Sequence, residues 1–170
     1  MRIKMSQMTQ LKTEEKGEQT GRLLIILSKG TMDMVAPALM IATTGATMGK
    51  EVHMFFTFWG MNAINKKTVG SLKVAPVGNP GMPMPNILGM IPGMTAMATR
   101  MMNGKMKKAK IPSIPEMMKT AKDLGVKFHA CSTTMEVMGI AKDTFIDEVD
   151  DVVGAATMLS LGEGGQIIFI

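Results

Sequence analysis

Residues 125–139 read GVKFHACSTTMEVMG, and this stretch predicts a strand that runs directly into a helix. Its first six residues form a short apolar run that is typical of a buried strand. The spacing Thr133-x-x-Glu136 is that of a capping box, which predicts a helix that begins there and ends near Gly139. The only cysteine of the chain, Cys131, therefore lies where the strand meets the helix.

Further apolar segments predict that strands alternate with helices along the chain. Strands are expected over residues 22–28, 51–58 and 165–170. Helices are expected over residues 31–49, 61–67, 114–124 and 151–161, with 144–150 as a linking segment. Asp33 is the candidate N-cap of the first helix, because its carboxylate can accept bonds from unpaired backbone N–H groups. The alternation indicates a mostly parallel sheet with helices on both faces.

In sheets of this kind, ligands bind beyond the carboxyl ends of the strands. Three segments of the chain follow predicted strands: Ser28-Lys29-Gly30, Thr57-Phe58-Trp59-Gly60, and Cys131. We therefore expect a site where these three segments meet.

The position of Cys131 at a helix N-terminus favours its thiolate, which is the reactive form of cysteine. The helix dipole is worth only about 0.3–1 kcal/mol at an exposed site, so a reactive thiol needs further help. Lys29 lies on the same edge and either supplies a stabilising cation or is a solvated loop residue. His129 lies two residues before Cys131 and is either catalytic or a hydrogen-bonded core residue. His53, within the second predicted strand, is a weaker candidate for a catalytic role.

The composition limits the possible functions. The 170 residues contain 46% hydrophobic and 19% charged residues, which fits one globular domain over 22–170. A single cysteine excludes an internal disulfide and a cysteine-rich zinc site. With 4% aromatic residues and no reader motif, the net charge of +5 does not indicate nucleic-acid binding. No nucleotide-binding or paired-histidine motif is present, so no cofactor or metal is expected.

Two segments stand apart from the predicted domain. Residues 1–21 are polar and lack the apolar core of a secretory signal, which predicts a mobile tail and a cytoplasmic protein. Residues 74–110 form an insertion that is rich in Met and Pro, carries no charge over 74–99 and is strongly basic over 100–110. This insertion packs on the domain or another subunit, serves as a lid or docking surface, or contacts an anionic membrane surface.

The chain resembles the DsrE/DsrF-like superfamily, in the DsrE-like branch labelled "peroxiredoxin family protein". The resemblance covers about residues 20–170 and rests most specifically on MFFTFWG (54–60) and ACSTTMEVMGI (130–140). It implies a three-layer α/β/α sandwich with a mostly parallel, doubly wound sheet, a homo-oligomer, and a cysteine that carries sulfane sulfur or thiosulfonate. That cysteine corresponds to Cys131. The implied partners are TusA-like or rhodanese-like sulfur-transfer proteins and a small sulfur oxyanion or persulfide donor. No peroxidatic motif supports the branch label.

Two hypotheses follow from the sequence. In the first, Cys131 carries sulfur and passes it to a partner thiol, either as a sulfurtransferase that turns over or as a stoichiometric carrier, with Ser28, Lys29, Gly30, Thr57, Trp59, Thr133 and His129 around it. In the second, the protein is a non-catalytic binding or scaffold protein that docks on a partner or a membrane surface through its Met-rich insertion.

Overall fold

The computed structural model describes residues 21–75 and 93–170. The tail predicted over residues 1–21 lies outside the described residues except for Gly21, as does the central part, 76–92, of the Met-rich insertion. None of the helices in the described ranges is both long enough and apolar enough to cross a membrane.

The centre of the fold is a five-stranded sheet in the order β4-β3-β2-β1-β5, in which every pair of neighbouring strands is parallel. Its strands are β1 (Arg22–Leu27), β2 (Glu51–Phe56), β3 (Lys127–Cys131), β4 (Asp151–Val153) and β5 (Gln166–Phe169). The α-helices are α2 (Met32–Thr47), α3 (Met94–Lys108), α4 (Ile114–Asp123), α5 (Ser132–Met138) and α6 (Ala155–Leu161). Short 3-10 helices are η1 (Phe58–Ala63), η2 (Val69–Ser71) and η4 (Lys142–Thr144).

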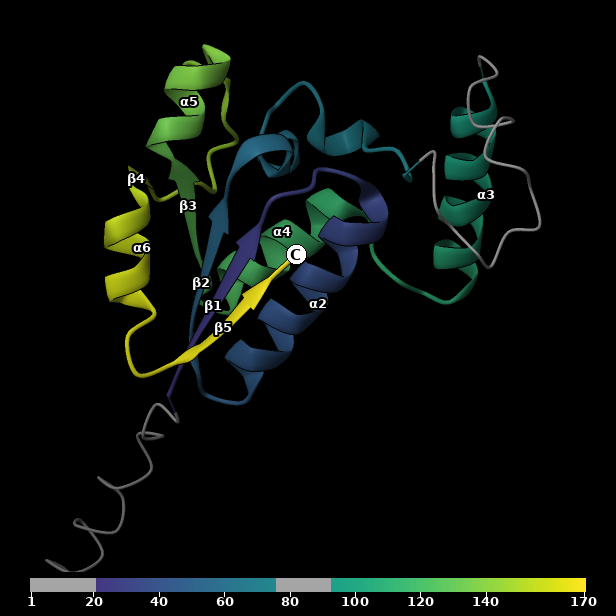
Figure 1. The fold of residues 1–170 in the computed structure, drawn as a ribbon. Coiled ribbons are helices and arrows are strands. Elements are labelled where there is room, and N and C mark those ends of the chain that lie inside the picture. The colour runs from purple at the N-terminus through teal and green to yellow at the C-terminus, as the bar shows by residue number, and fades with distance from the viewer. Residues whose placement is uncertain (1–20, 76–92) are drawn as a thin grey trace, which may run out of the picture.

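Helices cover both faces of the sheet, as the sequence predicts (Figure 1). On one face, α2 approaches β1 so closely that a Cβ atom at Gly45 would lie 2.7 Å from the Leu23 side chain. On the other face, the C-terminal end of α6 approaches β1, and a Cβ atom at Gly162 would lie 2.9 Å from Leu24. Neighbouring residues of one strand thus pack against different layers, which explains why β1 is an almost continuous apolar run.

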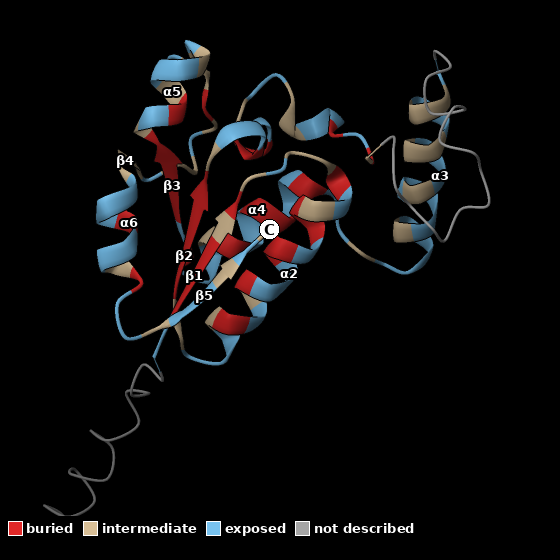
Figure 2. Cartoon of the chain, in the orientation of Figure 1, coloured by how far each residue is buried: buried red, intermediate tan, exposed pale blue. Residues whose placement is uncertain are grey.

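The buried residues gather in the central strands and in the helix faces turned toward them (Figure 2). Phe56 and Phe128 are fully buried and pack edge to face, with ring centroids 5.4 Å apart. By contrast, α3 stands at the periphery and contains no buried residue.

Three details of the predicted elements are wrong. The N-cap of α2 is Thr31, and Asp33 instead accepts a 2.8 Å hydrogen bond from the Ala75 N–H. Residues 151–153 form the edge strand β4 beside β3 rather than the start of a helix, because these residues pair with residues 129–131. The helix expected over 61–67 is a 3-10 helix over Phe58–Ala63.

Candidate functional site

The ends of three neighbouring strands bring the predicted site segments to one edge of the sheet. Leu27, Phe56 and Ala130 lie side by side in the registers of β1, β2 and β3. The loops that begin at Ser28 and Thr57 therefore lie beside Cys131 at the carboxyl edge. This is the arrangement that the sequence predicts.

The position of Cys131 within the site differs from the capping-box prediction. α5 begins at Ser132, so Cys131 itself is the N-cap residue and Thr133 lies in the first turn. The predicted Thr133–Glu136 capping box is therefore wrong, whereas Ser113 and Glu116 form a capping box where α4 begins. Cys131 is only 5% exposed.

The surroundings of Cys131 favour its ionised form. Burial acts to raise the pKa of the thiol, but polar hydrogens around the sulfur outweigh it and lower the pKa. They come from the hydroxyl and backbone N–H of Thr134, the hydroxyl of Thr57 and the backbone N–H of Thr133. In the structure, the Cys131 side chain forms no capping hydrogen bond with the N-terminus of α5. We therefore infer that these groups act on the thiolate rather than on the neutral thiol. The N–H groups belong to the second and third residues of α5, the usual partners of an N-cap side chain.

Thr134 connects the cysteine to the loop after β2. Its hydroxyl oxygen accepts a 3.1 Å hydrogen bond from the Phe58 N–H and lies 3.0 Å from the Thr57 hydroxyl oxygen. Thr134 is 3% exposed, which makes it one of the few buried polar residues of the described chain. Thr134 was not predicted as a site residue, because its neighbour Thr133 matches the capping pattern. The available signal was the place of Thr134 two residues after Ser132, where a backbone N–H can reach an N-cap side chain.

Two glycines lock the loops after β1 and β2 together. A Cβ atom at Gly60 would collide with the carbonyl oxygen of Leu27, and one at Gly30 would collide with the carbonyl oxygen of Trp59. The Gly60 N–H also donates a 3.1 Å hydrogen bond to the carbonyl oxygen of Ser28. Gly30 therefore allows the close contact between the two loops that positions the Trp59 backbone.

The loop after β2 presents two aromatic side chains to solvent beside the buried sulfur. Phe58 is 56% exposed and Trp59 is 66% exposed. Phe58 has a φ of 44°, a left-handed conformation that costs a bulky residue about 1–2 kcal/mol. Its N–H bond to Thr134 is one interaction that holds this conformation.

Ser28 and Lys29 have other surroundings. The Ser28 hydroxyl donates a 2.9 Å hydrogen bond to the carbonyl oxygen of Ile170 and so fixes the end of β5. Lys29 is exposed on the same loop.

His129 and His53 form a separate buried network on the face of the sheet that α6 covers. His129 Nδ1 lies 2.5 Å from Asp151 Oδ1, and its Nε2 lies 2.9 Å from His53 Nδ1. His53 Nε2 lies 3.3 Å from Glu51 Oε1 but has no hydrogen bond. Burial lowers the pKa of His53, although Glu51 opposes this effect. Both nitrogens of His129 are therefore engaged with His53 and Asp151.

Metal ligands do not gather in the described ranges, where no group of three or more His, Cys, Asp and Glu side chains could hold an ion.

The comparison with known proteins identifies the family. Residues 19–169 match the DsrE/DsrF/DrsH-like family. The chain belongs to this family. It is 39% identical over 157 residues to the sulfur carrier protein DsrE2 of Allochromatium vinosum, a match that covers 88% of this chain and 98% of that protein. It is 31% identical over 165 residues to the protein YrkE of Bacillus subtilis, with 90% and 99% of the two chains covered.

A solved structure shares the fold. The crystal structure of the ychN protein from E. coli matches 88% of this chain and 99% of its own with a TM-score of 0.50 and 11% sequence identity. At this identity the match supports the three-layer α/β fold alone.

Proposed function

We propose that this protein traffics sulfur by carrying it covalently on Cys131. The observation that carries the proposal is the lowered pKa of a cysteine at the N-cap of α5, surrounded by the Thr134 and Thr57 hydroxyls and two backbone N–H groups. The likeness to DsrE2, which is named a sulfur carrier, supports the same conclusion.

The transfer requires no external oxidant or reductant. The Cys131 thiolate attacks the outer sulfur of a donor persulfide R–S–SH, the donor S–S bond breaks, and the donor leaves as the thiolate R–S⁻. Cys131 then holds Cys–S–SH. An acceptor thiolate attacks that outer sulfur, takes it as a persulfide and restores the Cys131 thiolate. With tetrathionate as donor, the Cys131 thiolate attacks an inner sulfur, the central S–S bond breaks, thiosulfate leaves, and Cys–S–S–SO₃⁻ remains on the protein.

The residues around the sulfur stabilise negative charge at both ends of this exchange. The Thr134 and Thr57 hydroxyls and the N–H groups of Thr133 and Thr134 favour the attacking thiolate. The same polar hydrogens would also favour negative charge on the sulfur carried by the loaded cysteine. The chain therefore needs no second cysteine for the exchange.

The exposure of the site indicates how a partner would reach it. Because Cys131 is 5% exposed, the acceptor thiol must approach on a slender segment. TusA-like or rhodanese-like proteins, which present a reactive cysteine, are the proposed partners. We further propose that the protein is cytoplasmic, because a free reactive cysteine persists in a reducing compartment. A homo-oligomer remains the expectation that the family resemblance implies.

Intact-mass spectrometry tests the proposal. The full chain, incubated with polysulfide or tetrathionate and freed of excess reagent, should gain the mass of one or more sulfur atoms or of an S–SO₃ group. Dithiothreitol should remove the gain, and Cys131→Ser should abolish it.

The outcome distinguishes carriage from adventitious sulfur. A gain that persists in Cys131→Ser, or no gain in the wild-type protein, contradicts the proposal. Transfer is tested in a second step, in which the loaded protein is mixed with a TusA-like protein and the mass shift should move from one protein to the other.

A further inference from the structure

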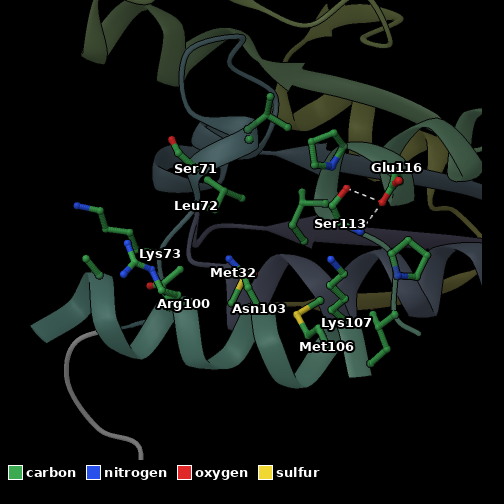
Figure 3. Close-up of a pocket in the computed structure, with 18 residues that line it drawn as sticks. Met32, Ser71, Leu72, Lys73, Arg100, Asn103, Met106, Lys107, Ser113 and Glu116 are labelled. Carbon is green, nitrogen blue, oxygen red and sulfur yellow. Dashed lines mark hydrogen bonds between the residues drawn. The ribbon is translucent and has the colours of Figure 1, made fainter. Parts of the chain in front are cut away.

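A cavity lies away from Cys131, between α3 and the body of the domain (Figure 3). Its volume is about 600 Å³. One wall is a face of α3, and the other consists of residues 69–73 and 111–116, the segments at η2 and at the start of α4. This volume lies within the range of roughly 300–1,000 Å³ that is usual for small-molecule sites.

The walls of the cavity carry excess positive charge. Lys73 lies on the body side, and Arg100 and Lys107 lie on α3. Within the described ranges, none of these three cations is part of an ion pair. Cations on opposite walls repel one another unless an anion lies between them.

Among the lining residues that the structure describes, the one carboxylate is already engaged. Glu116 Oε2 accepts a 2.8 Å hydrogen bond from the Ser113 N–H and a 2.7 Å bond from the Ser113 hydroxyl. These bonds lower the pKa of Glu116 and hold it as the partner of the α4 N-terminus. The described part of the lining therefore holds three cations and one carboxylate, which is oriented toward its own helix.

The rest of the cavity is largely apolar. Its lining includes Met32, Leu72, Met106, Ile111 and Ile114. Asn103 adds a hydrogen-bonding amide on the same face of α3 as Arg100 and Lys107. A bare inorganic anion would leave these apolar walls uncovered, whereas an anion with an apolar body would contact both kinds of surface.

The attachment of α3 is weak for a helix of 15 residues. It has no buried residue, and a 3.2 Å hydrogen bond from the Val74 N–H to the Thr99 hydroxyl links it to the preceding chain. Ala98, Met102 and Met106 are its partly buried contacts with the core. A ligand in the cavity would add contacts to both walls and so stabilise the seated helix.

We propose that this cavity binds an amphiphilic organic anion, whose phosphate or sulfonate head is attracted by the cations Arg100, Lys107 and Lys73 and whose apolar body contacts the Met and Ile side chains. This site is independent of sulfur carriage on Cys131 and goes beyond it.

Isothermal titration calorimetry of the full chain with hexyl phosphate tests the proposal, with hexyl glucoside as the neutral match. Hexyl phosphate should bind at one site, and Arg100→Gln combined with Lys107→Gln should weaken it by about tenfold or more. The matched control is Lys105→Gln combined with Lys108→Gln, which removes two charges from the same helix outside the cavity lining and should change affinity by less than about twofold.

Each contrary result overturns the proposal. Equal losses in the two double variants would show diffuse charge attraction, and equal binding of hexyl glucoside would show that the head is not recognised. Absence of one-site hexyl phosphate binding to the wild-type protein would also overturn it. Lys73→Gln checks the opposite wall and should weaken binding although it lies outside α3.

Cosedimentation with vesicles distinguishes the two sources of such an anion. If the head belongs to a lipid, the wild-type protein and the Lys105/Lys108 double variant should cosediment with phosphatidic acid vesicles. The Arg100/Lys107 double variant should then stay in the supernatant. If the ligand is a free metabolite, the vesicles should not discriminate between the variants while hexyl phosphate does. Both patterns support the proposed class of ligand.

Discussion

Cys131 occupies a position that serine, threonine and aspartate usually fill. An N-cap side chain accepts hydrogen bonds from the N–H groups of the second and third helical residues, and a neutral thiol accepts them poorly. The same N–H groups stabilise a thiolate much better, because bonds to a charged acceptor are stronger. Cys131 is therefore a poorer N-cap than serine, threonine or aspartate when neutral, but its position favours the ionised sulfur.

Thr134 is expected to control the ionisation of Cys131. Its hydroxyl has one hydrogen, and its oxygen accepts the Phe58 N–H while lying 3.0 Å from the Thr57 oxygen. The Thr57 and Thr134 hydroxyls have one hydrogen each, so only one of them donates to the sulfur while the two are bonded to each other. When Thr57 donates to Thr134, the Thr134 hydrogen is the one that bonds the sulfur. Thr134→Val removes this hydrogen at nearly constant shape and should raise the pKa of Cys131.

The pH dependence of iodoacetamide alkylation measures this effect. Since the pKa of Cys131 is lowered, the wild-type rate should rise with pH below the ordinary range of about 8.5. In Thr134→Val the rise should move to higher pH, with a rate at neutral pH lower by roughly tenfold. Thr134→Ser keeps the hydroxyl and should stay near wild type. If the serine variant behaves like the valine variant, packing rather than hydrogen bonding explains the effect.

At the scale of elements, the loops after β1 and β2 act as one unit because each leaves room for the other only at a glycine. Gly60→Ala should destabilise the protein by about 1–3 kcal/mol, because its Cβ would collide with the Leu27 carbonyl oxygen, which β1 holds in place. Gly70→Ala is the matched control, since a Cβ there meets nothing within 4 Å.

Thermal unfolding of the two glycine variants measures this difference. The Gly60 variant should lower Tm by several degrees, and the Gly70 variant should remain near wild type. The Gly60 variant should also expose Cys131 to alkylation more readily, since the displaced loop carries Thr57. Equal Tm values for both variants would show that the loop relaxes freely and does not lock the site.

The elements that the sequence predicts best are those with continuous apolar runs. Residues 22–28 and 51–58 indicate β1 and β2 because burial on both faces leaves a local mark. β4 has three residues and depends on pairing with β3, so no local pattern reveals it. Likewise, Thr134 and the contact between His53 and His129 arise from neighbouring strands and helices that are far apart in sequence. The sequence therefore indicates the edge where the candidate site lies and the cysteine proposed as its nucleophile, but not the groups that surround the sulfur.

At the scale of the whole molecule, the Asp150 side chain connects α4 with β3 directly before the start of β4. Its Oδ2 accepts a 2.6 Å bond from Lys122 Nζ of α4 and a 2.7 Å bond from the Phe128 N–H of β3. Lys127 Nζ lies 3.7 Å from its Oδ1, and β4 follows directly in the chain. Burial acts to raise the pKa of Asp150, but Lys122, the Phe128 N–H and Lys127 outweigh it and lower the pKa.

This lowered pKa fixes the direction of the pH dependence. The folded state holds the proton of Asp150 less tightly than the unfolded chain, whose carboxyl titrates near about 4. The stabilisation is therefore complete above that value and is lost as the pH falls through the lower pKa of the folded state. Asp150→Asn should lower the free energy of unfolding at neutral pH by about 1–3 kcal/mol, because the amide keeps the N–H bond but loses the charge.

Urea unfolding at neutral pH and at about pH 3 tests the argument. The gap between wild type and Asp150→Asn should be largest at neutral pH and shrink in acid, where the wild-type carboxylate also becomes protonated. Asp147→Asn is the control: Asp147 pairs with Lys66 at 3.1 Å, but its side chain is 93% exposed, so its loss should have little effect at either pH. A gap that stays constant with pH would mean that Asp150 stabilises the fold through its shape and hydrogen bond, and not through its charge.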